Sequence, residues 1–157
     1  MNKFSLLASA LAVIGAQISV PAYAQHFAVA GTTTTATGTA TVNGVACGLN
    51  LTVTLGPDLG LGAPHINHTD TATFSGQNTG PFPCPVFSVD GTIDSSGVLT
   101  DLTIYQAGSP ICSVTGASLP ITLANVGSDV HASLGTTTVG ACVVDAEMDV
   151  FGVQLVP

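Results

Sequence analysis

The sequence of 157 residues contains nine acidic residues and one basic residue, which gives a formal net charge of −8 at pH 7. The single cation is Lys3, close to the N-terminus. Proteins that bind nucleic acids or anionic lipids neutralise phosphate groups with Lys and Arg side chains, so this composition excludes both classes of partner.

The N-terminal segment has the pattern of a secretory signal peptide. Lys3 precedes an apolar stretch at residues 4–20, and the small residues Ala22 and Ala24 stand before Gln25. This combination is typical of a segment that is cleaved after Ala24, whereas a buried N-terminal helix is the alternative. We therefore expect residues 1–24 to be removed and the protein to be secreted to the cell surface or the exterior, with the periplasm not excluded.

Residues 25–157 are predicted to form a single all-β domain. No segment shows the apolar spacing of an amphipathic helix, whereas alternation of Thr with apolar residues recurs along the chain. The clearest example is 49–55, where Leu and Val alternate with Asn and Thr. Further strands are expected at 34–42, 71–75, 86–93, 98–105, 111–115, 119–124, 130–134, 137–144 and 147–156.

Turn signals separate these strands at short intervals. Gly, Pro, Asn and Asp cluster at 56–58, 76–81, 90–91, 94–97 and 127–129. Many short strands at this spacing predict an antiparallel β-sandwich or a closed barrel. A β-solenoid is the other architecture considered, but it needs a fixed short repeat, and the sequence has none.

The cysteines predict two disulfides. Cys47, Cys84, Cys112 and Cys142 all follow the predicted signal peptide, and an even number in an oxidising compartment favours disulfides of about 2–4 kcal/mol each. Zinc is less favoured because no C-x-x-C spacing occurs. Three connectivities are possible. The residues before Cys47 resemble those before Cys142, and the surroundings of Cys84 resemble those of Cys112, which favours the sequential pairing 47–84 and 112–142.

Two loops carry large apolar side chains that are candidates for binding. Leu59, Leu61 and Ile66 belong to the Gly- and Pro-rich loop 56–70, and Phe82 lies between two prolines in the loop 77–85. Binding residues are often placed on loops, and exposed apolar patches mark interaction sites. If Phe82 is exposed, we expect it to join the other three in one patch. Burial of Phe82 beneath its loop is the alternative.

His65, His68 and Asp70 form a candidate metal site. Two imidazoles three residues apart can chelate a transition metal when they lie on a helix or a tight turn. A loop does not guarantee this geometry, so a solvated polar loop is the simpler interpretation. No cofactor is otherwise expected.

Asp145, Glu147 and Asp149 share one face of a predicted strand, at roughly 7 Å intervals. A calcium ion needs several oxygens converging at about 2.4 Å, which a straight strand cannot supply. We therefore interpret these carboxylates as a solvent face that protects an edge strand from pairing with other chains, with a cation site as the alternative.

No catalytic motif is present. A G-x-S-x-G nucleophile elbow is absent, Glu147 is the single glutamate, and no Trp is available to line a sugar subsite. The four histidines, His26, His65, His68 and His131, coexist with Ser and Asp, but no local spacing supports a catalytic triad. We expect the protein not to be an enzyme.

Several segments have the character of a known family. They are the Thr-rich run 35–42, the Val45-Ala46-Cys47 segment that leads into 51–56, and the later segments 72–76 and 112–120. Together they resemble the alkane-oxidation activator (PraA/PraB-like) family of small secreted bacterial proteins, although Ile121 stands where that family is expected to carry Trp. The resemblance implies an exported, non-catalytic β protein that assists bacterial contact with, or dispersal of, an oily phase.

The expected function is therefore that of a secreted or cell-surface protein that assists contact with apolar substrates such as alkanes. An apolar surface or hydrocarbon is the expected partner, with a neutral glycan as a further one, and the negative charge keeps the protein soluble. The alternative is a structural subunit of a surface fibre or adhesin that self-assembles by strand addition, with the segment 27–42 as the donated strand.

Overall fold

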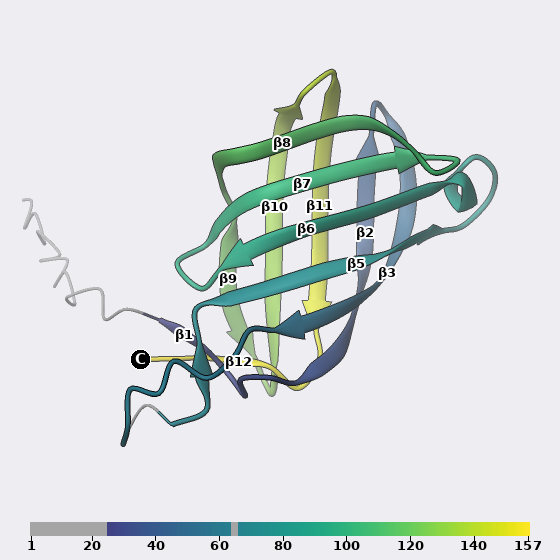
Figure 1. The fold of residues 1–157 in the computed structure, drawn as a ribbon. Helices are drawn as coiled ribbons and strands as arrows, with labels where there is room; N and C mark the ends of the chain where they lie inside the picture. Colours follow the sequence, from purple (N-terminus) through teal and green to yellow (C-terminus); the bar gives the residue numbers. More distant parts are fainter. Residues whose placement is uncertain (1–24, 64–65) are drawn as a thin grey trace, which may run out of the picture.

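The computed structural model describes residues 25–63 and 66–157, which form an almost entirely antiparallel β structure (Figure 1). The predicted signal peptide and His65 lie outside the described residues. The elements are β1 (His26–Ala28), β2 (Thr33–Val42), β3 (Val45–Leu55), β4 (His68–Thr69), β5 (Thr71–Thr79), the 3-10 turn η1 (Cys84–Val86), β6 (Phe87–Asp94), β7 (Val98–Gln106), β8 (Ser109–Pro120), β9 (Thr122–Val126), β10 (Asp129–Val139), β11 (Cys142–Val150) and β12 (Gln154–Val156).

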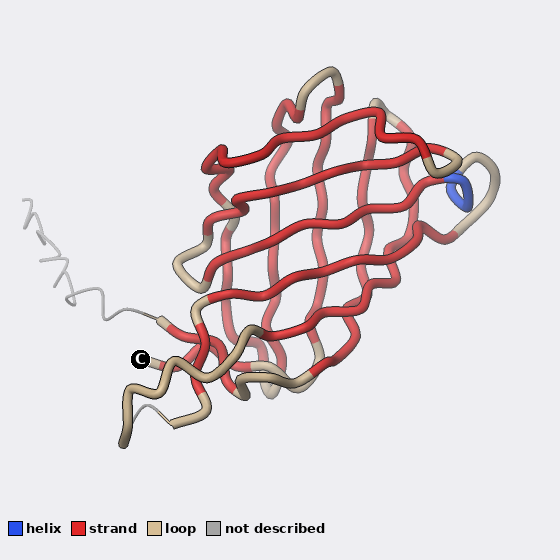
Figure 2. Tube along the Cα trace, viewed as in Figure 1, coloured by secondary structure: helices blue, strands red, loops and turns tan. Residues whose placement is uncertain are grey.

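Nine of these strands form one continuous sheet with the order β8-β7-β6-β5-β3-β2-β11-β10-β9. The sheet curls into a half-barrel, so that β5, β6, β7 and β8 form one layer that crosses over the layer of β2, β11, β10 and β9 (Figures 1 and 2). Two packed layers of one antiparallel sheet confirm the predicted sandwich-type, all-β fold.

The core lies between the two layers because the strands alternate apolar and polar residues. On β3 the side chains of Leu49, Leu51, Val53 and Leu55 are buried, whereas the Asn and Thr residues between them are exposed, as the alternation predicts. Buried side chains from the other layer, such as Phe74 and Leu102, complete the same hydrophobic cluster.

Three glycines permit the strong curl of the sheet. Gly38, Gly76 and Gly91 occupy positions where the alternation would direct a side chain into the core. A Cβ at Gly38 would overlap the carbonyl oxygen of Glu147 on the neighbouring strand, and a Cβ at Gly91 would lie 2.6 Å from the carbonyl oxygen of Asp101. Glycine therefore allows the close backbone approach that a curved sheet requires.

A small three-stranded sheet with the order β12-β1-β4 covers one end of the half-barrel. Phe27 on β1 pairs with Leu155 on β12 and with Thr69 on β4. The side chains of Phe27, Val153 and Leu155 are buried and join the main core, so the small sheet closes this end of the interior.

Two disulfides, Cys47–Cys84 and Cys112–Cys142, confirm the sequential pairing. The first joins β3 to η1. The second joins β8, an edge strand, to β11 near the opposite edge of the same sheet, so it fastens one layer to the other. The backbone itself joins the two edge strands, because Ile121 alone separates β8 from β9.

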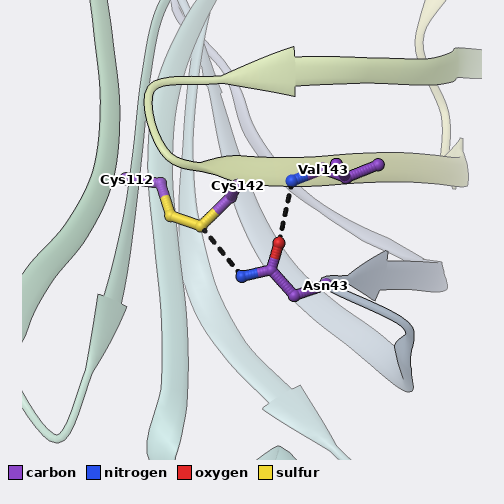
Figure 3. Close-up of a disulfide and its surroundings, with 4 residues drawn as sticks. All are labelled: Asn43, Cys112, Cys142 and Val143. Atoms are coloured by element: carbon purple, nitrogen blue, oxygen red, sulfur yellow. Dashed lines mark hydrogen bonds between the residues drawn. A yellow bond between two sulfur atoms is a disulfide. The ribbon is translucent and has the colours of Figure 1, made fainter.

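The β2–β3 hairpin turn supports the second disulfide. Asn43 and Gly44 have φ of 49° and 82°, as a type I′ turn requires. The Asn43 side chain accepts a hydrogen bond of 2.9 Å from the backbone N–H of Val143, and its Nδ2 lies 3.6 Å from Cys142 Sγ (Figure 3). The turn is thereby tied to the start of β11.

Several predicted strands and one predicted turn were wrong in their extent. The segments 111–115 and 119–124 were expected as separate strands, whereas β8 is continuous from Ser109 to Pro120 and β9 begins at Thr122. The turn expected at 90–91 lies within β6. The segment 137–144 contains the turn between β10 and β11, and the segment 147–156 contains the turn between β11 and β12. Gly140 and Gly152, with φ of 58° and 66°, make these turns. Each glycine is isolated among apolar residues, so the alternation did not show the break. The short strands β1 and β4 were not predicted.

Among residues 25–63 and 66–157, no helix has the length and apolar content needed to cross a membrane.

The Gly38→Ala substitution is expected to lower the free energy of unfolding by about 1–3 kcal/mol, because its Cβ would collide with backbone atoms of β11 that cannot move independently. Equilibrium urea unfolding measures the change. Gly135→Ala is the matched control, since no atom lies within 4 Å of its Cβ, and it should change stability by less than about 0.5 kcal/mol. Equal effects of the two substitutions would contradict the role of Gly38 in the curl.

Replacement of Cys112 and Cys142 together by Ala is expected to lower the free energy of unfolding by about 3–4 kcal/mol, according to the length of the loop that the disulfide closes. Amide hydrogen exchange should accelerate in both edge strands, β8 and β9. The double variant Cys47→Ala and Cys84→Ala removes a disulfide that closes a loop of similar length. It should accelerate exchange around η1 instead. Unchanged protection of β9 in the first variant would show that the sheet stays closed without this disulfide.

Candidate functional site

The loop between β3 and β4 carries three of the predicted site residues, and its described residues, 56–63 and 66–67, are named the apolar loop below. It projects from the end of the molecule that the small sheet covers (Figure 1). Leu59, Leu61 and Ile66 are 41%, 55% and 60% exposed, respectively. The loop thus presents large apolar side chains to solvent within a short stretch of chain.

Backbone hydrogen bonds brace the base of the apolar loop. The N–H of Gly56 donates to Thr71 O at 2.8 Å, and the N–H of Leu59 donates to His68 O at 2.9 Å. The carboxylate of Asp58 accepts from the N–H of Gly60 at 2.9 Å and from the N–H of Asn67 at 3.3 Å. The charged side chain of Asp58 thus satisfies two backbone donors of the loop, and the loop is held in this shape while its apolar side chains are exposed.

Phe82 lies in a different place from the other three residues. Its side chain is 85% exposed, so the alternative of burial beneath the loop is wrong. The segment is held by the Cys47–Cys84 disulfide and by a hydrogen bond of 2.9 Å from Cys84 N–H to Pro81 O. It follows β5, whereas the apolar loop precedes β5, and this strand spans about 27 Å. The structure therefore does not bring Phe82 into one patch with the apolar loop.

His68 and Asp70 lie in a polar cluster at the base of the apolar loop. The ring of His68 stacks on that of His26, with centroids 5.8 Å apart. His26 Nδ1 and Asp70 Oδ1 are 2.5 Å apart, and Ser95 donates a hydrogen bond of 2.5 Å to Gln25 O. These contacts fasten β1, and with it the small sheet, to the β6–β7 turn.

The cluster does not complete the predicted metal site within the described part of the chain. His65, the third member of the predicted group, lies outside the described residues. Among residues 25–63 and 66–157, no group of three or more His, Cys, Asp or Glu side chains is arranged to hold a metal ion.

The acidic residues of β11 face solvent, but not at an edge of the sheet. Asp145, Glu147 and Asp149 pair with Thr residues of β2, and Asp149 Oδ1 lies 2.7 Å from His131 Nδ1 on β10. Because β11 is paired on both sides, the interpretation that these carboxylates protect an edge strand is wrong. The edges are β8 and β9 instead, which the sequence pattern could not identify.

The sequence did not predict a groove on the outer face of the sheet. It is about 380 Å³ in volume and crosses β3, β5, β6 and β7. Thr52, Thr54, Thr73, Asp90 and Asp101 line it together with Phe74. The available signal was the recurrence of Thr, Ser or Asp at positions two apart, as in Thr52-x-Thr54 and Asp90-x-Thr92, which places polar side chains on one face of a strand.

Tyr105 on β7 is coupled to Asp90. Its hydroxyl donates a hydrogen bond of 3.1 Å to Asp90 Oδ2. This hydrogen bond, together with desolvation and the negative charge of Asp90, raises the pKa of Tyr105 above its ordinary value of 10.0. Asp90 is therefore held as an acceptor beside the groove.

The interior between the two layers is packed core rather than a ligand chamber. Its apolar space has a volume of about 90 Å³ and is lined by core residues such as Leu51, Phe74 and Ile104. Ligand pockets for drug-sized molecules have volumes of about 300–1,000 Å³. A ligand of that size would therefore have to lie on the outer surface or the loops.

No family model, curated protein or solved structure matches the chain. The chemistry of the surface is consequently the basis for a functional proposal.

Asp90→Asn should lower the pKa of Tyr105 towards 10.0, because the negative charge that favours the neutral phenol is removed. NMR of the tyrosine ring carbons during a pH titration measures this. Since the folded pKa is raised, the interaction stabilises the fold below pH 10.0 and its contribution disappears as the pH rises through the folded pKa. Asp94→Asn on the same strand is the control, and a similar decrease there would contradict a specific contact.

Proposed function

We propose that this protein is an exported, non-catalytic protein that contacts apolar matter, such as hydrocarbon, at or outside the cell surface through the apolar loop. The observation that carries the proposal is the exposure of Leu59, Leu61 and Ile66 on a loop with a hydrogen-bonded base. Because the base is braced, these side chains can enter an apolar phase without unfolding of the strands behind them.

The energetics support contact rather than insertion. Full burial of a Leu or Ile side chain contributes about 1.5–3 kcal/mol, and roughly half of each side chain is available here. Three such side chains contribute a few kcal/mol together, which is enough for reversible adsorption. The nine acidic residues of the chain repel other copies and anionic surfaces, so adsorption to neutral apolar matter is favoured over self-association.

The setting of this function follows from the sequence. The signal-peptide pattern and the two disulfides both support an oxidising, exported location. The resemblance to the alkane-oxidation activator family points to the same use, since it implies assistance with an oily phase.

The fibre subunit remains the alternative proposal. The segment 27–42 is a poor donor strand, because β2 pairs with β3 on one side and with β11 on the other. Strand addition would instead use β8 or β9, the edges of the large sheet. Assembly of this kind predicts oligomers that resist SDS, whereas the apolar-contact function is compatible with a monomer.

The triple variant Leu59→Ser, Leu61→Ser and Ile66→Ser should reduce adsorption to a hexadecane–water interface at least about tenfold, because it removes the apolar area that the loop offers. The decrease of interfacial tension at a hexadecane drop measures adsorption, and circular dichroism checks that the fold is kept.

The matched control is the triple variant Ile111→Ser, Val126→Ser and Val143→Ser, which removes exposed apolar side chains from other parts of the surface. It should adsorb like the unmodified protein. If both triple variants lose adsorption equally, contact is non-specific and the role of the apolar loop is wrong. Phe82→Ser tests separately whether the opposite end of β5 also makes contact.

A further inference from the structure

The outer face of the large sheet carries two parallel rows of polar side chains that run across five strands. Strand register brings the members of each row opposite one another. The first row consists of Thr103, Asp90, Ser75, Thr52 and Thr35, and the second row consists of Asp101, Thr92, Thr73, Thr54 and Thr33.

The geometry of the rows follows from the sheet. Neighbouring strands are about 4.8 Å apart, so each row extends for about 19 Å across the five strands. Residues two apart on a strand are separated by about 6.8 Å, which is the distance between the two rows. The groove of about 380 Å³ includes members of both rows, with Gly91 between Asp90 and Thr92. The groove itself crosses β3, β5, β6 and β7, and the rows continue beyond it to Thr33 and Thr35 on β2. The rows and the groove together are named the channel below.

The chemistry of the rows fits a neutral ligand rich in hydroxyl groups. Each Thr or Ser hydroxyl both donates and accepts, and the carboxylates of Asp90 and Asp101 accept. An anionic ligand is excluded because the sequence has no Lys or Arg after Lys3. A peptide would need a free edge or apolar pockets, and the rows lie on strands that are paired on both sides.

The shape of the rows favours a chain over a single sugar. One sugar ring can contact one or two strands, whereas the hydroxyls continue across five strands at nearly regular intervals. Thr side chains are branched at Cβ, which restricts their χ1 angles and reduces the conformational entropy lost on binding.

We propose that a neutral polysaccharide binds along this channel and lies across the strands, with its hydroxyl groups bonded to the two rows. The charge of the chain, the distribution of donors and acceptors and the length of the rows together select this occupant. The channel is separate from the apolar loop, so the protein has one surface for apolar matter and another for a neutral glycan.

Isothermal titration calorimetry with neutral hexasaccharides of glucose, mannose and galactose tests the proposal. The unmodified protein should bind at least one of these probes. The triple variant Thr52→Val, Thr54→Val and Thr73→Val should raise its Kd about tenfold or more, because three hydroxyls are lost while side-chain shape and strand preference are kept.

The triple variant Thr115→Val, Thr122→Val and Thr138→Val is the control, since it removes three hydroxyls from β8, β9 and β10. It should leave Kd unchanged. Binding should also persist when NaCl is raised from about 0.05 to about 0.5 M, because no ionic contact is involved.

Three results would overturn the proposal. They are the absence of binding to every hexasaccharide, equal weakening by both triple variants, and loss of binding at high salt, which hydrogen bonds between hydroxyl groups should not show. None of these results depends on adsorption to hexadecane, so the failure of this proposal and the failure of the apolar-contact function are distinguishable.

Discussion

The closure of one curled sheet onto itself is the constraint on which the rest of the structure depends. No Lys or Arg follows Lys3, so carboxylates in the described part of the chain cannot pair with a permanent cation, and the layers are held by apolar burial and by sulfur. The Cys112–Cys142 disulfide joins the edge strand β8 to β11 in the other layer. The direct passage of the chain from β8 to β9 joins the two edges of the sheet. Apolar side chains such as Leu51 can then be buried between the layers.

Closure also decides where function can lie. A filled interior of only about 90 Å³ of free space leaves no room for a large ligand, so candidate sites are displaced to the loops and to the outer face. The loops at the ends of β5 bear exposed apolar side chains such as Leu61 and Phe82, whereas the outer face carries rows of Thr, Ser and Asp residues. The two proposed activities therefore use surfaces of opposite chemistry, one on a loop and the other on the outer face of the large sheet.

The two proposals together describe a protein that would bridge two kinds of matter. With one apolar loop and one polar face, it would hold neutral, hydroxyl-rich material near an oily phase. The uniform negative charge opposes aggregation of the exposed apolar loop, and the hydrogen bonds of Asp58 keep that loop in shape.

The sequence alone determined the strand-only fold, the inward face of 49–55 and the favoured disulfide pairing. Alternation and turn residues are local, and the flanks of the cysteines carry the pairing signal. Only the tertiary structure decided that Phe82 lies far from Leu59, that β11 is an inner strand and that the polar residues of five strands align in rows. These properties depend on strand order and register, which arise from contacts between residues distant in the chain and leave no local pattern.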